Sequence, residues 1–188
     1  IIALDARIVL SKEPVAKPVI RPYPVEYTTK WNDITLRPVR PEDEPLFGAF
    51  HRSLSTETIH ARYFQEMTLE ERTNHERMIR ICHADYDREL LLCAFREEQL
   101  LGVVRLHKLP QSHIGTLKLI VIDTMQQKGL GAKLLSEAIC IARKENLRAL
   151  EVQILTDKKA MEKLLTREGF TLNPSERNPN IVNAHLDL

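Results

Sequence analysis

Residues 121–132 contain the residue types and spacing in this sequence that are best suited to bind phosphate. They read Val-Ile-Asp-Thr-Met-Gln-Gln-Lys-Gly-Leu-Gly-Ala, so an apolar run leads through a polar loop to two closely spaced glycines. An apolar stripe predicts a helix from near Gly129, and the first amides of a helix are unpaired and partly positive. Gly129 and Gly131 have no side chains to block these amides, and Lys128 adds a full positive charge. The stretch therefore suits a diphosphate group.

Two common phosphate-binding motifs do not fit this stretch. A Walker A loop requires glycine, then lysine, then serine or threonine, whereas here Lys128 precedes Gly129. A dinucleotide-binding fingerprint requires a third glycine where Leu134 stands, although Glu151 lies near the expected acidic position. The pattern that fits is Gln/Arg-x-x-Gly-x-Gly/Ala, and the alternative is that the glycines only ease a tight turn.

The elements that must position this loop follow from the hydrophobic patterning. Alternation of period two predicts strands at 34–39, 89–95, 100–107, 117–122, 149–155 and 181–188. Helical spacing predicts helices that begin near Pro41 and Gly129 and others at 56–64, 69–81 and 158–167. A run of antiparallel strands followed by a strand–helix–strand unit indicates one α+β, or mixed α/β, domain.

Local signals refine several of these elements. The helix after the glycines ends near Asn146, and its apolar stripe is formed by Leu130, Leu134, Leu135, Ala138, Ile139 and Ala142. Thr68 and Glu71 have the spacing of a capping box. A tight turn at residues 96–98 predicts a hairpin between the second and third strands.

Composition excludes several classes of protein. The 188 residues carry 27 Lys+Arg against 26 Asp+Glu, which argues against a dedicated nucleic-acid binder. No apolar run approaches the roughly 20 residues that span a bilayer. The 7 histidines form no metal-ligand spacing, so we expect no metal. We expect the three cysteines, Cys82, Cys93 and Cys140, to be buried thiols of a cytoplasmic protein.

The N-terminal part differs in composition from the rest of the chain. Four of the ten prolines, Pro14, Pro18, Pro22 and Pro24, fall in its first 24 residues, and proline favours extended backbone. Residues 10–30 therefore resemble a linker, and we expect the folded domain to cover 31–188. The start of the chain does not resemble a signal peptide and reads as a piece of a longer protein.

The loop pattern at Gln126, Gly129 and Gly131 resembles the acyl-CoA diphosphate loop of the GNAT N-acetyltransferase superfamily. The order of elements agrees from about residue 31 to 188, and residues 164–170, Leu-Leu-Thr-Arg-Glu-Gly-Phe, match the usual helix ending in Gly-Phe. The resemblance implies a mostly antiparallel mixed sheet flanked by helices and acetyl-CoA as acyl donor. It assigns acetyl-CoA binding to Ile120, Val121, Ile122, Gln126, Gln127, Lys128, Gly129, Leu130, Gly131, Ala132 and Lys158.

A narrower resemblance is to bacterial protein lysine acetyltransferases that carry a domain similar to ADP-forming acyl-CoA synthetases. The matching segments lie in order at 36–43, 54–58, 62–64, 85–89 and 102–106. Residues 3–8 are similar to the last strand of the synthetase-like part, so residues 1–30 are expected to be its remnant and a linker. This implies an upstream synthetase-like domain in the full-length chain.

The resemblance implies direct acetyl transfer from acetyl-CoA to an amine. The strand before the loop would separate from its neighbour and bind the pantetheine arm through backbone groups near 120–122, one of which would polarise the thioester carbonyl. A lysine with a free pKa of ~10.4 costs about 4.6 kcal/mol to deprotonate at pH 7. A positioned base usually relieves part of this cost.

The sequence departs from the family where that base is expected. The usual glutamate falls on Thr116, the usual asparagine on Lys158 and the usual tyrosine acid on Leu165. Substitute bases are His113, whose imidazole suits proton transfer near neutral pH, and Glu66, which follows the 62–64 segment. The alternatives are an exposed loop histidine and a solvated helix-end charge.

Three functions remain open on this evidence. The first is a protein lysine acetyltransferase that acts on proteins such as acyl-CoA synthetases. The second is a non-catalytic or weakly catalytic acetyl-CoA sensor, which the missing glutamate favours. The third is a GNAT enzyme that acts on a small amine.

Overall fold

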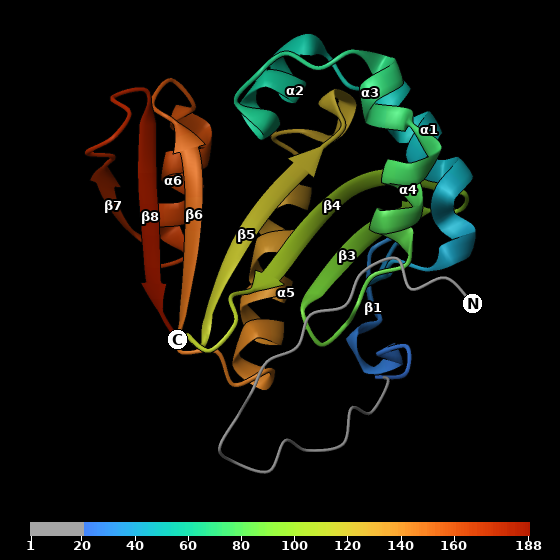
Figure 1. The fold of residues 1–188 in the computed structure, drawn as a ribbon, viewed down its shortest axis with the longest axis horizontal. Helices are drawn as coiled ribbons and strands as arrows, with labels where there is room; N and C mark the ends of the chain where they lie inside the picture. The colour runs from blue at the N-terminus through green and yellow to red at the C-terminus, as the bar shows by residue number, and fades with distance from the viewer. Residues whose placement is uncertain (1–20) are drawn as a thin grey trace, which may run out of the picture.

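The structure is a computed structural model that describes residues 21–188. The elements follow the chain in this order (Figure 1): η1 (Val25–Tyr27), β1 (Thr29–Trp31), β2 (Ile34–Pro38), η2 (Pro41–Asp43), α1 (Glu44–Arg52), α2 (Thr56–Tyr63), α3 (Leu69–Thr73), α4 (His75–Cys82), β3 (Glu89–Arg96), β4 (Gln99–Lys108), β5 (Ile114–Val121), η3 (Asp123–Met125), α5 (Leu130–Lys144), β6 (Ala149–Leu155), α6 (Lys159–Arg167), β7 (Thr171–Pro174) and β8 (Ile181–Asp187).

The strands form one eight-stranded sheet in the order β1-β2-β3-β4-β5-β6-β8-β7. Neighbouring strands are antiparallel except β5 and β6, which run parallel because α5 returns the chain between them. This confirms the predicted mixed α/β class with a mostly antiparallel sheet. The single parallel pair lies at the centre of the molecule, where the two halves of the sheet meet (Figure 1).

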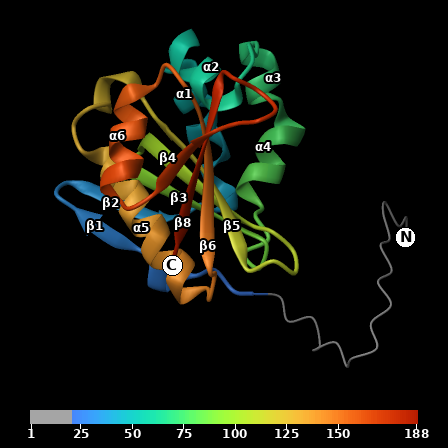
Figure 2. The same cartoon turned by 90° about the vertical axis from the view of Figure 1, so that its left-hand side faces the viewer.

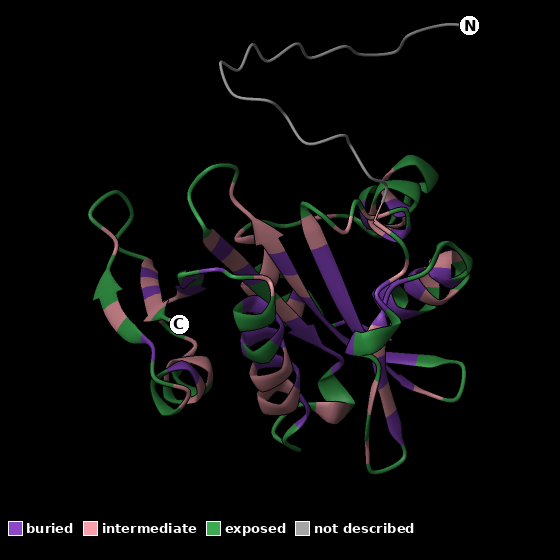
Figure 3. Ribbon diagram, turned by 90° about the horizontal axis from the view of Figure 1, so that it is seen from below, coloured by how far each residue is buried: buried purple, intermediate pink, exposed green. Residues whose placement is uncertain are grey.

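Helices cover both faces of the sheet. Figure 2 shows α5 and α6 on one side and α2, α3 and α4 on the other. The predicted apolar stripe of α5 is buried, and Leu130, Leu134 and Ala142 are fully so. Figure 3 shows the buried residues concentrated in the central strands and in the helix faces turned toward them. Burial of this stripe is the main force that holds α5, and therefore the loop before it, against the sheet.

Several local predictions are confirmed. Residues 97–98 turn the β3–β4 hairpin, and Thr68 and Glu71 form the capping box at the start of α3. The helix predicted over 69–81 is instead two helices. Asn74 leaves the helical conformation, and its side chain accepts a hydrogen bond from the Glu76 amide to cap α4.

The folded part begins earlier than the predicted boundary at residue 31. Residues 25–31 form η1 and the edge strand β1, and Tyr27 is buried. The Arg21 guanidinium donates two hydrogen bonds, of 2.6 and 2.7 Å, to the Glu145 carboxylate at the end of α5. The segment resembling a synthetase strand, residues 3–8, and the first half of the predicted linker lie outside the described residues.

The cysteine prediction is wrong at one position. Cys82 and Cys93 are buried, but Cys140 is exposed because it lies on the side of α5 that faces away from the sheet. Within residues 21–188, no helix is both long and apolar enough to cross a membrane.

Candidate functional site

The parallel strands β5 and β6 separate partway along their length. Their pairing begins at Ile114 and Ala149 and ends at Leu117 and Val152, so the last part of β5 has a neighbour only on the β4 side. This is the separation that the family resemblance implied. It leaves an open strand edge close to the loop before α5.

Backbone direction decides which groups face this opening. The Ile122 amide donates to the Leu101 carbonyl, 2.9 Å away, and backbone groups alternate along a strand. Ile120 and Ile122 therefore point toward β4, and Leu119 and Val121 point toward the opening. Of the three residues predicted to bind pantetheine through backbone groups, Val121 alone is in the correct orientation.

The loop before α5 presents free amides at the helix N-terminus. Gly129 is the N-cap residue and has a φ of 88°, a left-handed conformation that favours glycine. The first backbone bond inside the helix runs from the Lys133 amide to the Gly129 carbonyl, 3.0 Å, so the amides of residues 130–132 have no helical acceptor. No side chain within the described residues caps this end, and the first turn holds no acidic residue. The end of α5 can therefore accept an anion.

The glycines keep the approach to these amides open. A Cβ atom at Gly131 would lie 3.7 Å from the nearest protein atom, on Leu119, so the protein itself would tolerate a small side chain there. A Cβ atom at Gly129 would meet the ring of Trp31 at 3.6 Å. Gln127 and Lys128 are exposed beside the loop, where their side chains can reach a ligand.

The side chain of Gln126 forms hydrogen bonds within the protein. Its side-chain nitrogen donates to the Thr58 hydroxyl, 2.9 Å away, and to the Val121 carbonyl, 3.1 Å away. Both hydrogen bonds engage the side-chain amide nitrogen of Gln126 with other groups of the protein. Gln126 therefore holds the loop against α2 and β5, and its contact with acetyl-CoA stays a prediction.

Asp123 fixes the same loop to the start of α2. Its carboxylate accepts hydrogen bonds from the Ser55 amide at 2.9 Å, the Ser55 hydroxyl at 2.5 Å and the Thr58 hydroxyl at 2.8 Å. Burial opposes ionisation of Asp123, but these bonds outweigh it and lower the pKa of the carboxyl. The loop and α2 are thus one connected unit.

A cavity of about 170 Å³ lies on the sheet face opposite α5. Its lining residues are Arg105 and His107 from β4 and Thr116 and Lys118 from β5. Leu119 packs toward Gly131 of α5, so its neighbour Lys118 points to the other face, where α2 lies. This is the face on which an acceptor could approach the opening between β5 and β6.

His107, which the sequence did not single out, also lines this cavity. It is the direct cross-strand partner of Thr116, the position where the family resemblance places a glutamate. Its Nδ1 is buried, has no hydrogen-bond partner among residues 21–188 and lies 3.9 Å from the Glu89 carboxylate. His107 lies opposite Thr116 because of the register between β4 and β5, and no local sequence pattern predicts that register.

The two predicted bases lie elsewhere. His113 is exposed in the turn before β5, and its carbonyl accepts a hydrogen bond from the Arg148 amide. It lies at the paired end of a strand of eight residues, about 25 Å from the loop. Glu66 is exposed in the connection between α2 and α3 and does not line the cavity. This placement does not favour either residue as the base.

The remaining predicted positions are also placed. Lys158 pairs with Glu57 of α2 at 2.7 Å, and this hydrogen bond raises its pKa, so its charge is used within the protein. Leu165 lies on the buried face of α6 and can supply no acid. No cluster of metal-ligating side chains occurs in residues 21–188.

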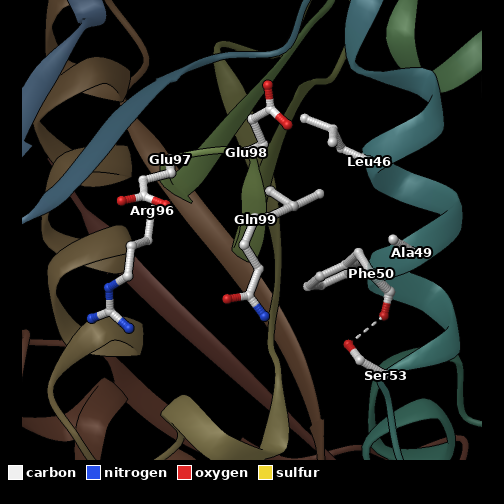
Figure 4. Close-up of a pocket in the computed structure, with 9 residues that line it drawn as sticks. Leu46, Ala49, Phe50, Ser53, Arg96, Glu97, Glu98 and Gln99 are labelled. Carbon is white, nitrogen blue, oxygen red and sulfur yellow. Dashed lines mark hydrogen bonds between the residues drawn. The ribbon is translucent and has the colours of Figure 1, made fainter.

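A second cavity, of about 380 Å³, lies between α1 and the β3–β4 hairpin (Figure 4). Its wall combines the apolar Leu46 and Phe50 with the charged hairpin residues Glu97 and Glu98. The Ser53 hydroxyl in it donates to the Phe50 carbonyl of its own helix, 2.8 Å away. It is separate from the opening between β5 and β6, and we assign it no catalytic role.

Comparison with solved structures supports the fold. The GNAT domain of S. lividans PAT superposes with a TM-score of 0.80 at 20% identity and covers 89% of this chain and 100% of its own. The paia N-acetyltransferase of Thermoplasma acidophilum, in complex with coenzyme A, has a TM-score of 0.67 at 17% identity, covering 82% and 99%. The ribosomal alpha-N-protein acetyltransferase RimL, also with coenzyme A, has a TM-score of 0.62 at 17% identity, covering 88% and 97%.

The family assignment rests on a sequence model. The model of the acetyltransferase (GNAT) family matches residues 54–170, which include the cavity, the open edge of β5 and the loop before α5. Acetyl-CoA is the acyl donor that this family binds. The chain belongs to the GNAT acetyltransferase family.

Proposed function

We propose that this chain is the catalytic domain of an acetyl-CoA-dependent N-acetyltransferase that acetylates lysine side chains of proteins such as acyl-CoA synthetases. The observation that carries the proposal is the uncapped N-terminus of α5 beside the open edge of β5. The ordered match of short segments to protein lysine acetyltransferases supports the choice of acceptor.

The residues around the loop fit acetyl-CoA. The free amides of residues 130–132 and the exposed Lys128 would hold the diphosphate. The backbone groups of Leu119 and Val121 face the opening, where they would bind the pantetheine arm and polarise the thioester carbonyl. The separation of the strands gives this arm access to the face that carries the cavity.

Acetyl-CoA supplies an activated acetyl group, whose carbonyl carbon bonds to the acceptor nitrogen as the C–S bond breaks and coenzyme A leaves with one proton. The acceptor must first be a neutral amine. In the cavity, His107 is the side chain suited to take that proton near neutral pH. The carboxylate of Glu89, 3.9 Å from Nδ1, would orient and stabilise the protonated imidazole.

A second candidate function is an acetyl-CoA sensor without turnover. Two observations favour it: none of the four residues that line the cavity is a carboxylate, and Thr116 occupies the position of the family glutamate. A sensor and an enzyme would share the same loop and differ only in the acceptor cavity.

One experiment distinguishes the enzyme from the sensor. The chain is incubated with acetyl-CoA and an acyl-CoA synthetase, the acceptor is examined by mass spectrometry, and the released thiol is assayed. Acetyl-lysine formed together with thiol supports the enzyme. Binding of acetyl-CoA without thiol release on any lysine protein supports the sensor. Absence of acetyl-CoA binding by calorimetry would overturn both, and Gly131→Glu serves as the control for specific binding.

A further inference from the structure

Two like charges face each other in the centre of the acceptor cavity. Arg105 of β4 and Lys118 of β5 are direct cross-strand partners, an arrangement that normally destabilises a sheet. Glu89 balances Arg105, whose Nε lies 2.7 Å from its carboxylate. Within residues 21–188, Lys118 has no carboxylate partner; burial lowers its pKa, as do the charges of Arg62 and Arg105.

Arg62 and Arg77 are two further cations: the charge of Arg62 acts on Lys118, and the charges of Arg105 and Arg77 act on Arg62. The guanidinium groups of Arg62 and Arg77 lie over the ring of Tyr63, at 5.0 and 5.4 Å from its centre. The Nε atoms of both are buried without a hydrogen-bond partner in the described part of the chain. Burial lowers the pKa of Arg62 to about 10; the nearby Tyr63 opposes this shift, and the charges of Arg105 and Arg77 add to it. Unsatisfied buried donors of this kind are costly unless a ligand engages them.

The charge at this site is therefore unbalanced. Among residues 21–188, Arg105 pairs with the carboxylate of Glu89, whereas Arg62, Arg77 and Lys118 form no salt bridge. A cavity of about 170 Å³ has room for a carboxylate or phosphate group on a short arm, but not for a large anion. The cations would repel a protonated amine that entered alone, and the carboxylate of Glu89, already paired with Arg105, would offset this repulsion only in part.

We propose that the cavity binds an anionic group of the acceptor, so that the amine acetylated here carries a carboxylate close to it. This inference rests on the proposed acetyl transfer at the same site. The carboxylate would bind between Lys118 and Arg62, and the neighbouring cations would lower the pKa of the incoming ammonium group and ease its deprotonation. The carboxylate has two sources: an acidic residue beside a lysine in a protein, or the α-carboxylate of a free amino acid.

Binding can be tested without acetyl transfer. In two blocked peptides, a norleucine replaces lysine and is flanked by two glutamates in one and by two glutamines in the other. We expect calorimetry on the full chain, loaded with coenzyme A, to give at least tenfold tighter binding of the glutamate peptide, falling as salt is raised. Lys118→Gln should remove most of this preference, whereas Lys163→Gln, at an exposed site on α6, should preserve it.

Turnover identifies the source of the carboxylate. The matching lysine peptides and free lysine are compared by kcat/KM for thiol release, and whichever anionic acceptor is favoured over the glutamine peptide identifies the source. Equal affinity of the two norleucine peptides, or a preference that survives Lys118→Gln, overturns the inference even if lysine peptides are acetylated. A binding preference without any turnover would preserve the inference about the cavity and contradict the proposed enzyme.

Discussion

Thr58 and Gln126 are joined by a hydrogen bond of 2.9 Å that connects the acceptor face to the diphosphate loop. The same Thr58 hydroxyl donates to the Asp123 carboxylate, 2.8 Å away. One hydroxyl in α2 therefore fixes the loop at two points, the first residue of the short helix η3 and the residue that follows this helix. Since the loop orients the free amides of α5, changes in α2 should be felt at acetyl-CoA.

Replacing Thr58 by valine tests this connection. Thr58→Val keeps the shape of the side chain and removes both hydrogen bonds, each worth about 0.5–1.5 kcal/mol. We expect acetyl-CoA affinity, measured by calorimetry, to fall about 5- to 30-fold and the melting temperature to fall by several degrees. Thr73→Val, whose hydroxyl donates only to the Leu69 carbonyl in α3, is the matched control. Equal affinity in the two variants would show that the loop holds its shape without α2.

Two substitutions at Gly131 distinguish an effect of charge on acetyl-CoA binding from an effect on the stability of the fold. A Cβ atom there meets only ordinary contacts, and alanine favours helix over glycine by about 1 kcal/mol. Gly131→Ala should therefore be at least as stable as the native chain and bind acetyl-CoA with a modest loss. Gly131→Glu places a carboxylate at the free amides and should weaken binding more than tenfold while the melting temperature stays within a few degrees. Native affinity in Gly131→Glu would exclude this helix end as the diphosphate site.

The single tryptophan reports on the same site. The ring of Trp31 lies 3.6 Å from the Cβ position of Gly129, so an anion bound at the loop changes the polarity around the indole. We expect acetyl-CoA to change the fluorescence with the dissociation constant found by calorimetry. Pantetheine, which lacks the diphosphate, should give no change at equal concentration. A response to pantetheine as large as that to acetyl-CoA would place the contact elsewhere.

Local patterns sufficed to predict the elements whose faces differ in polarity. The stripe of α5 is buried as predicted because its period is visible in sequence, and Asn146, with a φ of 57°, follows the end of this helix. The strand β1 was missed because it has only three residues, too few for alternation to be visible, although the two-residue turn at Asn32 and Asp33 that pairs it with β2 is local. The ion pair of Arg21 with Glu145 spans 124 residues, which no local pattern records.

The candidate site likewise has one part that local sequence patterns predict and one part that they do not. The loop before α5 and the helix start that follows it could be predicted because glycines, a lysine and an apolar helical stripe are adjacent in sequence. The acceptor cavity could not, because it depends on which residue of β4 faces which residue of β5. His113 was chosen for its proximity in sequence to β5, yet a strand of eight residues separates it from the loop. His107 was overlooked although it lies directly opposite Thr116.

The position of Thr116 allows a test for the base. Thr116→Glu would place a carboxylate beside His107, and if proton removal limits the reaction, kcat should rise about tenfold or more. Thr116→Gln, of similar size but uncharged, should not raise it. His107→Gln should lower kcat about 10- to 100-fold with unchanged acetyl-CoA affinity, measured by thiol release and calorimetry. If His107→Gln kept the native kcat, a group other than His107 would be the base that removes the proton from the amine.

Glu145 predicts how stability depends on pH. Burial opposes its ionisation, but hydrogen bonds from Arg21, Lys108 and Tyr27 outweigh this and lower its pKa from 4.5 to about 2. A carboxyl whose pKa is lower in the folded than in the unfolded state adds its full contribution to the stability of the fold at any pH above the unfolded-state pKa. This contribution is lost as the pH falls from 4.5 toward 2. After allowance for screening by solvent, it is on the order of 2 kcal/mol.

Glu145→Gln removes that contribution and leaves Arg21 and Lys108 without their shared anion. We expect its melting temperature at pH 7 to fall by about 4–8 °C and the difference from the native chain to shrink between pH 4.5 and pH 2. Glu137→Gln disrupts only the pair with Lys133 within α5 and should shift melting by less than about 2 °C. A constant difference between Glu145→Gln and the native chain across this pH range would mean that the carboxylate charge is not what fixes residues 21–27 to α5.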